Sequence, residues 1–127
     1  LSEGTYQLLK GVMKFGTPNN PLDLTGQVAG DPELYGTVLE KFINDENFDI
    51  LIISMFTLRK EHLKYRIDRL IDMYGSTKKP ILVLWPGADI GGDLARSMLK
   101  AKIPVFASLY SCLKGAKALI DYNRRVS

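Results

Sequence analysis

Three short aliphatic runs, separated by segments of helical periodicity, constrain the fold of this 127-residue chain more than any other feature. The runs are Ile50–Ile53, Pro80–Trp85 and Ile103–Phe106. Because they lack the alternation of polar and apolar residues seen in half-exposed strands, they are typical of strands buried on both faces. Such strands alternate with helices in parallel sheets, whose right-handed crossovers cover both faces. The sequence therefore predicts an α/β domain with a parallel sheet.

Apolar residues at helical spacing predict the elements around these strands. Ser2 is a good N-cap for a first helix, and Asp31-Pro32 is an N-cap followed by Pro at the first helical position. The expected helices begin after Ser2, at Asp31-Pro32, near Lys60, ahead of Leu94 and after Ser111. The third of them is expected to run from about Lys60 to Tyr74.

The segment Asn20–Gly26 is the first candidate for a site. Leu22–Leu24 is expected to form a short strand that passes through a Gly-ended loop to the helix at Asp31. Such a loop exposes backbone N–H groups that bind anions or acyl groups. The Asp23 carboxylate has two compatible interpretations: it accepts N–H groups of the loop, or it contacts a substrate or a phosphorylated partner group. Asn20 is likewise either a turn-former before Pro or a polar contact.

Composition excludes several classes of function. The net charge is +3 and the basic residues are scattered, so no dense cationic stripe for nucleic acid is expected. No apolar run approaches the roughly 20 residues of a membrane span, and no signal peptide is visible. The single cysteine, Cys112, excludes an internal disulfide framework and favours a reducing cytoplasm.

No catalytic residue or metal site is predicted from the residues alone. His62, the only histidine, is interpreted as a solvated surface residue, and Cys112 as a structural one. Dinucleotide, Walker-type and Ser–His–Asp patterns are absent. In parallel sheets, ligands bind beyond the carboxyl ends of the strands. Those ends are Thr25-Gly26, Ser54–Thr57, Pro86–Ala88 and Ala107-Ser108.

The order of several phrases resembles one family. Asn20–Gly26 matches an N-P-[VL]-D-[LV]-x-G phrase throughout, and a helix with Tyr35 follows. Asp45–Asp49 is similar to a D-x-N-x-D phrase before an aliphatic strand. Lys78–Gly87 resembles a K-K-P strand that ends in Gly, and Ile103–Phe106 an I-P-V-[FY] strand. Together these phrases resemble the flavodoxin-like domain of NDP-forming acyl-CoA synthetases, the relatives of succinyl-CoA synthetase.

The resemblance implies a flavodoxin-like three-layer sandwich with a mainly parallel sheet. It covers residues 1–127 as a single domain, which we expect to be a fragment of a larger multidomain protein. The first strand of the family's domain has no counterpart in the chain, so we expect that strand to lie upstream. The place of the missing strand in the sheet is then closed, left exposed, or filled by association with another chain. A homo-oligomer is one form that such association takes.

The resemblance also implies an activity. The full-length enzyme would interconvert acyl-CoA, ADP and phosphate with the free acid, CoA and ATP, through an acyl phosphate and a phosphohistidine. CoA, ATP or ADP and Mg²⁺ would be bound by CoA-binding and ATP-grasp domains of the same or a partner chain, and this domain alone would bind no cofactor. It would be inactive alone, with no catalytic residue of its own.

Two groups of residues would line the acyl-phosphate site, where the small carboxylic acid is bound. The groups are Asn20, Asp23, Thr25 and Gly26, and Ser54, Met55, Phe56 and Thr57. Two alternatives remain: a stand-alone flavodoxin-like binding or signalling module, and a regulatory protein that keeps the ligase scaffold without catalysis.

Overall fold

The computed structural model describes residues 1–56, 60–89 and 92–126. The chain divides into two compact units. Unit 1 holds the described residues of Leu1–Asp49 and Arg59–Lys79, and unit 2 those of Ile50–Leu58 and Pro80–Ser127. Unit 1 is helical, whereas unit 2 carries the sheet.

Unit 2 is built on a small open parallel sheet, which confirms the α/β class. Its strands are β1 (Leu51–Ser54), β2 (Ile81–Leu84) and β3 (Val105–Phe106), in the order β1-β2-β3. Leu51 is in register with Ile81, and Val83 with Val105. Each strand overlaps one of the three aliphatic runs that were expected to form strands. β3 has only two residues, at the end of its run.

β2 is buried as expected, whereas β1 is not. Ile81, Leu82 and Val83 are at most 1% exposed. Ile52 is 40% exposed, and Ser54 is also exposed. The expectation of burial on both faces is therefore wrong for β1. The physical reason is its position, because β1 is an edge strand and pairs only with β2 among the described residues.

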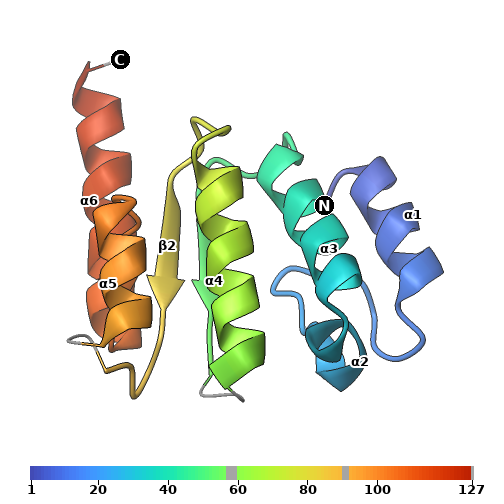
Figure 1. Ribbon diagram of the computed structural model, residues 1–127. Helices are drawn as coiled ribbons and strands as arrows, with labels where there is room; N and C mark the ends of the chain where they lie inside the picture. The colour runs from blue at the N-terminus through green and yellow to red at the C-terminus, as the bar shows by residue number, and fades with distance from the viewer. Residues whose placement is uncertain (57–59, 90–91, 127) are drawn as a thin grey trace. The chain divides into compact units, whose positions relative to one another are not determined.

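Two helices complete unit 2: α5 (Asp93–Lys100) and α6 (Leu109–Val126). α5 contacts β3, and α6 packs against β2 and β3. Leu82, Cys112 and Ala116 form the buried cluster between β2 and α6. The C-terminal turns of α6 project past the end of α5 in Figure 1. The turn after β2 is closed by the Ala88 N–H donating to Trp85 O at 3.1 Å, with Gly87 at φ +76°.

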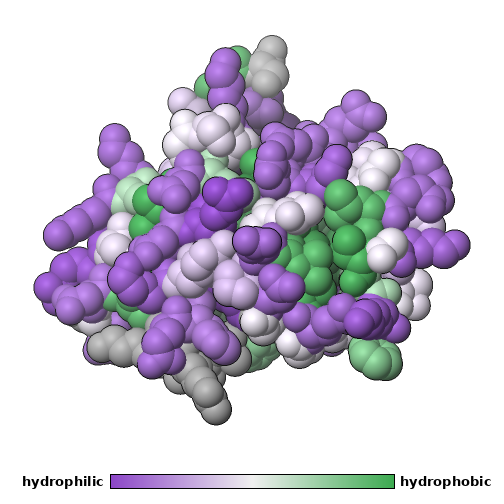
Figure 2. Space-filling view, turned by 45° about the vertical axis from the view of Figure 1, so that its right-hand side comes forward, coloured by the Kyte–Doolittle hydropathy of each residue, from purple (hydrophilic) through white to green (hydrophobic). Residues whose placement is uncertain are grey.

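Unit 1 packs four helices: α1 (Glu3–Val12), α2 (Thr25–Gly30), α3 (Pro32–Asn44) and α4 (Lys60–Tyr74). α3 contacts each of the other three and lies between α4 and α1 in Figure 1. Its core includes a cluster of Leu9, Met13, Val28 and Val38. Half-buried residues such as Leu8 and Val12 pack on this cluster. Figure 2 shows apolar side chains that reach the surface in its right-hand half.

The expected helix starts in unit 1 are confirmed. Ser2 caps α1, because its Oγ accepts the Thr5 N–H at 3.4 Å. Asp31 caps α3 by accepting the Leu34 N–H at 3.0 Å, and Pro32 takes the first helical position. α4 has the bounds that the periodicity predicts.

The expected strand at Leu22–Leu24 is wrong. The segment has no regular structure, and a helix, α2, begins directly at Thr25. Both leucines pack against the core cluster of unit 1, but no strand partner pairs with the segment among the described residues. An Asx turn also bends the backbone here, since Asp23 Oδ1 accepts the Thr25 N–H at 2.9 Å. The Asn20–Pro21 peptide bond is cis.

The expected cap of the last helix is also wrong. α6 begins at Leu109, two residues ahead of Ser111. Ser108 is the cap: its Oγ accepts the Ser111 N–H at 3.2 Å, and its carbonyl accepts the Cys112 N–H at 3.1 Å. Either serine side chain can cap a helix. Because β3 is short and ends at Phe106, Ser108 takes the N-cap position of α6.

Within the described ranges, no helix combines the length and apolar character that a membrane crossing requires.

Candidate functional site

The loop Asn20–Gly26 is held by its own carboxylate. Asp23 is exposed, yet its Oδ1 accepts the N–H of Thr25, two residues ahead, at 2.9 Å. The expected structural role of Asp23, to fix the loop by binding backbone N–H groups, is therefore confirmed. Asn20 is exposed beside it. The helix that follows, α2, has only six residues.

Thr25 stores backbone strain at this loop. Its φ is +53°, the left-handed region that a β-branched residue rarely enters. Strain of this kind costs about 1–2 kcal/mol and persists where the surroundings enforce it. The next residue, Gly26, is exposed, and a Cβ added to it would meet nothing within 4 Å. Packing inside the protein therefore gives no reason for glycine at this position.

The second group of predicted site residues follows β1, in unit 2. Ser54 ends the strand and is exposed, and Phe56 is 68% exposed. Met55 between them is only 3% exposed, and its N–H donates to Leu84 O at 2.8 Å. Met55 therefore anchors the segment, whereas Ser54 and Phe56 are presented to solvent. Thr57 lies outside the described residues.

Asp45 belongs to the acidic phrase after α3 and is only 3% exposed. Its Oδ2 accepts the Ser2 N–H at 2.9 Å and the Ser2 Oγ–H at 3.0 Å, and its Oδ1 accepts the Asn47 N–H at 2.9 Å. Burial raises the pKa of the carboxyl, but hydrogen bonds from Thr5, Asn47 and Ser2 outweigh it and hold the pKa well below its usual range. Asp45 is thus a buried carboxylate with a structural role.

A lysine joins two of the phrases on which the family resemblance rests. Lys79 Nζ donates to the backbone carbonyl of Asp45 at 2.5 Å. The acidic phrase and the K-K-P phrase therefore meet in unit 1, at the exit of α3. Phe48 of the acidic phrase stacks on Phe42 with ring centroids 5.4 Å apart. These contacts fix the geometry of the chain just before β1 and β2.

Other residues with reactive side chains have structural surroundings. Tyr35 is 4% exposed, and the Arg66 guanidinium carbon lies 5.1 Å from its ring centroid. Burial raises the pKa of Tyr35, partly offset by the charge of Arg66. Cys112 is fully buried, which raises the pKa of its thiol and disfavours a reactive thiolate. His62 is exposed in the first turn of α4.

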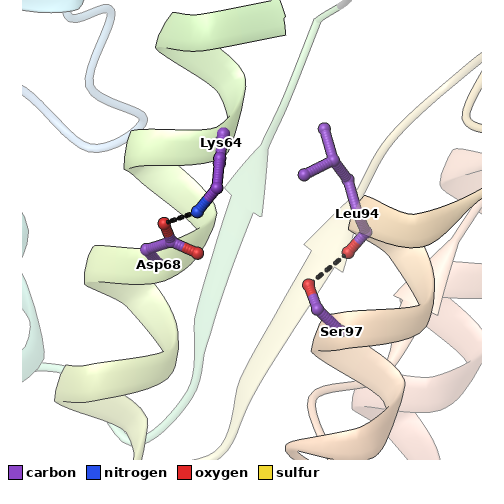
Figure 3. A network of polar contacts seen from close by, with 4 residues as sticks. All are labelled: Lys64, Asp68, Leu94 and Ser97. Carbon is purple, nitrogen blue, oxygen red and sulfur yellow. Dashed lines mark hydrogen bonds and ion pairs between the residues drawn. The ribbon is translucent and has the colours of Figure 1, made fainter.

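Some of the exposed charges of the helices form local pairs. Lys64 pairs with Asp68 one turn along α4, and Lys117 pairs with Asp121 at 2.6 Å in α6. Figure 3 labels the first pair and, separately, a contact within α5, in which Ser97 Oγ donates to the Leu94 carbonyl at 2.7 Å. Such pairs each contribute about 0.2–0.5 kcal/mol to a helix and are not signs of catalysis. In the described ranges, no three His, Cys, Asp or Glu side chains gather as a metal-binding set.

A surface pocket of about 240 Å³ opens in unit 1, between the C-terminal halves of α3 and α4. It is lined by Glu40, Ile43, Asn44, Arg69, Asp72, Met73 and Ser76. None of the predicted site residues lines it, so it is separate from the loop at Asn20–Gly26.

Sequence reasoning did not single out Trp85. The side chain is 5% exposed, and its Nε1–H is buried without an acceptor in the described part of the chain. It directly follows β2, at a strand end where parallel sheets bind ligands. A tryptophan at the end of a buried strand was visible in the sequence, but an unsatisfied donor is visible only in three dimensions.

Comparison with known proteins finds no matching family model, no matching curated protein and no matching solved structure.

Proposed function

We propose that this chain is the flavodoxin-like CoA-ligase domain of an NDP-forming acyl-CoA synthetase. The full protein would interconvert acyl-CoA, ADP and phosphate with a free carboxylic acid, CoA and ATP. The observation that supports the proposal is the Asn20–Gly26 loop, which carries the family's phrase. Its carboxylate locks the backbone, Thr25 is strained, and Gly26 leaves open space. Backbone strain is common at functional sites, and glycine lets a ligand approach the backbone closely.

In this proposal the chain shapes the site and the chemistry is supplied elsewhere. The loop forms one wall of the acyl-phosphate site and faces a phosphohistidine carried by another domain. Asp23 presents the loop, and Gly26 gives the incoming group room. CoA, the nucleotide and Mg²⁺ belong to CoA-binding and ATP-grasp domains of the same or a partner chain. The isolated domain is accordingly inactive, and no residue in it acts as a general acid or base.

The three-stranded sheet is consistent with the flavodoxin-like fold that this proposal includes. In a flavodoxin-like order, the first strand lies in the middle of the sheet. β1 has an unpaired edge among the described residues, where such a strand would add. The Leu51 and Met55 N–H groups donate to β2, so the backbone groups of Ile52 and Ser54 face that edge.

Two glycines of α2 give a matched test of the site. Gly26 and Gly30 are both exposed, and a Cβ at either would meet nothing within 4 Å. Gly26→Ala and Gly30→Ala would be made in the full-length protein, together with the parent. Each would be assayed for acyl-CoA formation from a panel of carboxylic acids with CoA, ATP and Mg²⁺, and for transient phosphorylation of a histidine. We expect Gly26→Ala to lower both signals about tenfold or more, and Gly30→Ala to leave them within about twofold.

The same experiment separates the alternatives. Equal acyl-CoA formation in both variants would show that the Asn20–Gly26 loop does not line the acyl-phosphate site, although the protein would still be a ligase. Absence of acyl-CoA formation and of histidine phosphorylation with every acid would contradict the ligase. That result would favour a regulatory or binding module that keeps the scaffold without catalysis.

A further inference from the structure

α6 exposes more apolar surface than a helix packed on a sheet normally does. Only Cys112 and Ala116 are buried along its 18 residues. Its large exposed apolar residues are Leu109, Tyr110, Leu113, Leu119, Ile120, Tyr122 and Val126, with exposed fractions from 39% to 69%. A contiguous apolar patch commonly marks a binding surface, whereas single exposed apolar residues are ordinary.

One sheet residue is exposed on the same face as α6. Ile52 of β1 is in register with Leu82 of β2, so both side chains project from one face of the sheet. Leu82 is 1% exposed because it packs in the cluster with Cys112 and Ala116. Ile52 is 40% exposed on that face. α6 therefore covers β2 and β3 and leaves the adjoining part of β1 uncovered.

The apolar flank of α6 lies on the side toward β1. A Cβ at Gly115 would lie 2.7 Å from the Phe106 ring of β3, which shows which side of α6 faces β3. Leu109, Leu113 and Ile120 lie on the opposite side of the helix, at spacings of four and seven residues. We call these three residues and Ile52 the α6 flank. Arg124 and Lys117, which pairs with Asp121 one turn along, are exposed beside Leu113 and Ile120.

The charges of α6 indicate what fits this flank. The outermost side of the helix, opposite Cys112, carries Lys114, Lys117, Asp121 and Arg125, so a flat lipid surface would meet a polar ridge before the apolar residues. α6 holds four basic residues and one acid, Asp121, so a second copy packed helix to helix would bring like charges together. A helix with an acidic edge avoids both problems.

We propose that the α6 flank docks an amphipathic α-helix from another polypeptide segment. The apolar stripe of that helix covers Ile52, Leu113 and Ile120, and its acidic edge meets Lys117 and Arg124. A helix in this position completes the cover that parallel sheets require on each face. The inference rests on the geometry of unit 2 and does not depend on the proposed ligase activity.

Synthetic helical peptides test this docking with the full 127-residue chain. The probe is a peptide of about 18 residues, or five helical turns, with a leucine stripe flanked by glutamates. The matched peptide keeps the leucines and replaces every glutamate with lysine. Binding is followed by fluorescence anisotropy, and the contacted residues by NMR shift changes. We expect the acidic peptide to bind about tenfold or more tightly than the basic one and to shift amides of β1 and α6.

Two variants locate the surface. Leu113→Glu places a charge in the flank, and Tyr122→Glu places the same charge on the other side of α6, where Tyr122 is 66% exposed. We expect Leu113→Glu to weaken acidic-peptide binding about tenfold or more, and Tyr122→Glu to change it about twofold or less. Circular dichroism confirms that both variants fold.

Each other outcome overturns the proposal. Failure of the acidic peptide to bind, equal binding of both peptides, or equal loss in both variants excludes helix docking at the flank. Binding to vesicles of anionic phospholipid that is lost in Leu113→Glu assigns the surface to a membrane. A dimer that sediments as a monomer after Leu113→Glu assigns it to a second copy of the chain.

Discussion

At the scale of single residues, the strongest local determinant in unit 1 is the Asp45 carboxylate. It accepts hydrogen bonds from Ser2 at one end of the unit's sequence and from Asn47 at the exit of α3. Its backbone carbonyl accepts a further bond from Lys79. One residue therefore ties three separate segments of the chain together. Hydrogen bonds to a buried charge are individually stronger than neutral ones.

Asp45→Ala should lower the free energy of unfolding by about 3 kcal/mol at pH 7, because buried donors of Ser2 and Asn47 lose their acceptor. The pKa of Asp45 is lower in the folded state than in the unfolded state, so its stabilisation is complete above the unfolded pKa of about 4. It is lost progressively as the pH falls below that value. Urea unfolding of parent and variant from pH 7 to pH 3 checks both points. A gap between them that does not narrow in acid would contradict the assignment.

Some of these contacts and conformations of single residues were predictable from the sequence, and others were not. The Asx turn of Asp23 was predictable because its partner, Thr25, is two residues away. The strain at Thr25 was not, because nothing in a threonine signals a φ of +53°. The bond from Lys79 to Asp45 spans 34 residues, and no local pattern encodes such a pairing. Local chemistry is therefore legible in the sequence, whereas long-range partners depend on the assembled fold.

At the scale of elements, the close approach of α6 to the sheet depends on one glycine. Gly115 leaves the space that the Phe106 ring of β3 fills, and Leu82 lies within reach of the same point. Glycine weakens a helix interior by about 1 kcal/mol relative to alanine. The packing of α6 against Phe106, which glycine permits, therefore compensates for the loss of helix stability at this position.

Gly115→Ala and Gly11→Ala form a matched pair for this contact. A Cβ at Gly115 would come within 2.7 Å of the Phe106 ring, whereas one at Gly11 of α1 would meet nothing within 4 Å. We expect Gly115→Ala to destabilise the protein by about 1–3 kcal/mol through overpacking, despite its better helix propensity. Gly11→Ala should be neutral or stabilise by up to about 1 kcal/mol. Thermal unfolding measures both, and stabilisation by Gly115→Ala would show that α6 shifts away from β3 at no cost.

The elements themselves were largely predictable. The runs around β1 and β2 are short but rich in isoleucine and valine, which favours strands, and the amphipathic pattern of α4 extends over 15 residues. Leu22–Leu24 failed because two leucines around one polar residue fit a strand and an irregular turn equally well. The Asx turn of Asp23 and the start of α2 at Thr25 leave no room for a strand. Ser111 failed because Ser108 has the same capping chemistry three residues earlier.

At the scale of the whole molecule, the chain divides into two compact units, and each holds a buried cluster among the described residues. Unit 1 is organised around Leu9, Val28 and Val38, and the α6 side of unit 2 around Leu82 and Cys112. Because each cluster draws its residues from one unit, each unit has its own source of hydrophobic stabilisation. The single domain of 127 residues stays a prediction, and no local pattern in the sequence marks the border between the two units. Both units are assembled from two separate stretches of the chain, which composition does not reveal.

Leu9→Ala and Leu82→Ala should separate the two units in hydrogen exchange. Both residues are at most 1% exposed, and truncation of a buried leucine costs about 2–5 kcal/mol. We expect Leu9→Ala to accelerate exchange of amides in α1 and α3 first, and Leu82→Ala those in β2 and α6 first. Mass spectrometry of peptide fragments gives the exchange of each element. Equal acceleration in every element by either variant would instead show a single cooperative unit.

The order of strands in the sheet has a consequence for how the protein is made. β1, β2 and β3 stand in the sheet in the order in which they occur in the chain, so each new strand adds at the edge left by the one before. During synthesis, β2 finds its partner already translated, and β3 finds β2. No strand has to wait for a later one to be inserted beside it. The sheet can therefore grow from one edge in the order in which its strands are synthesised.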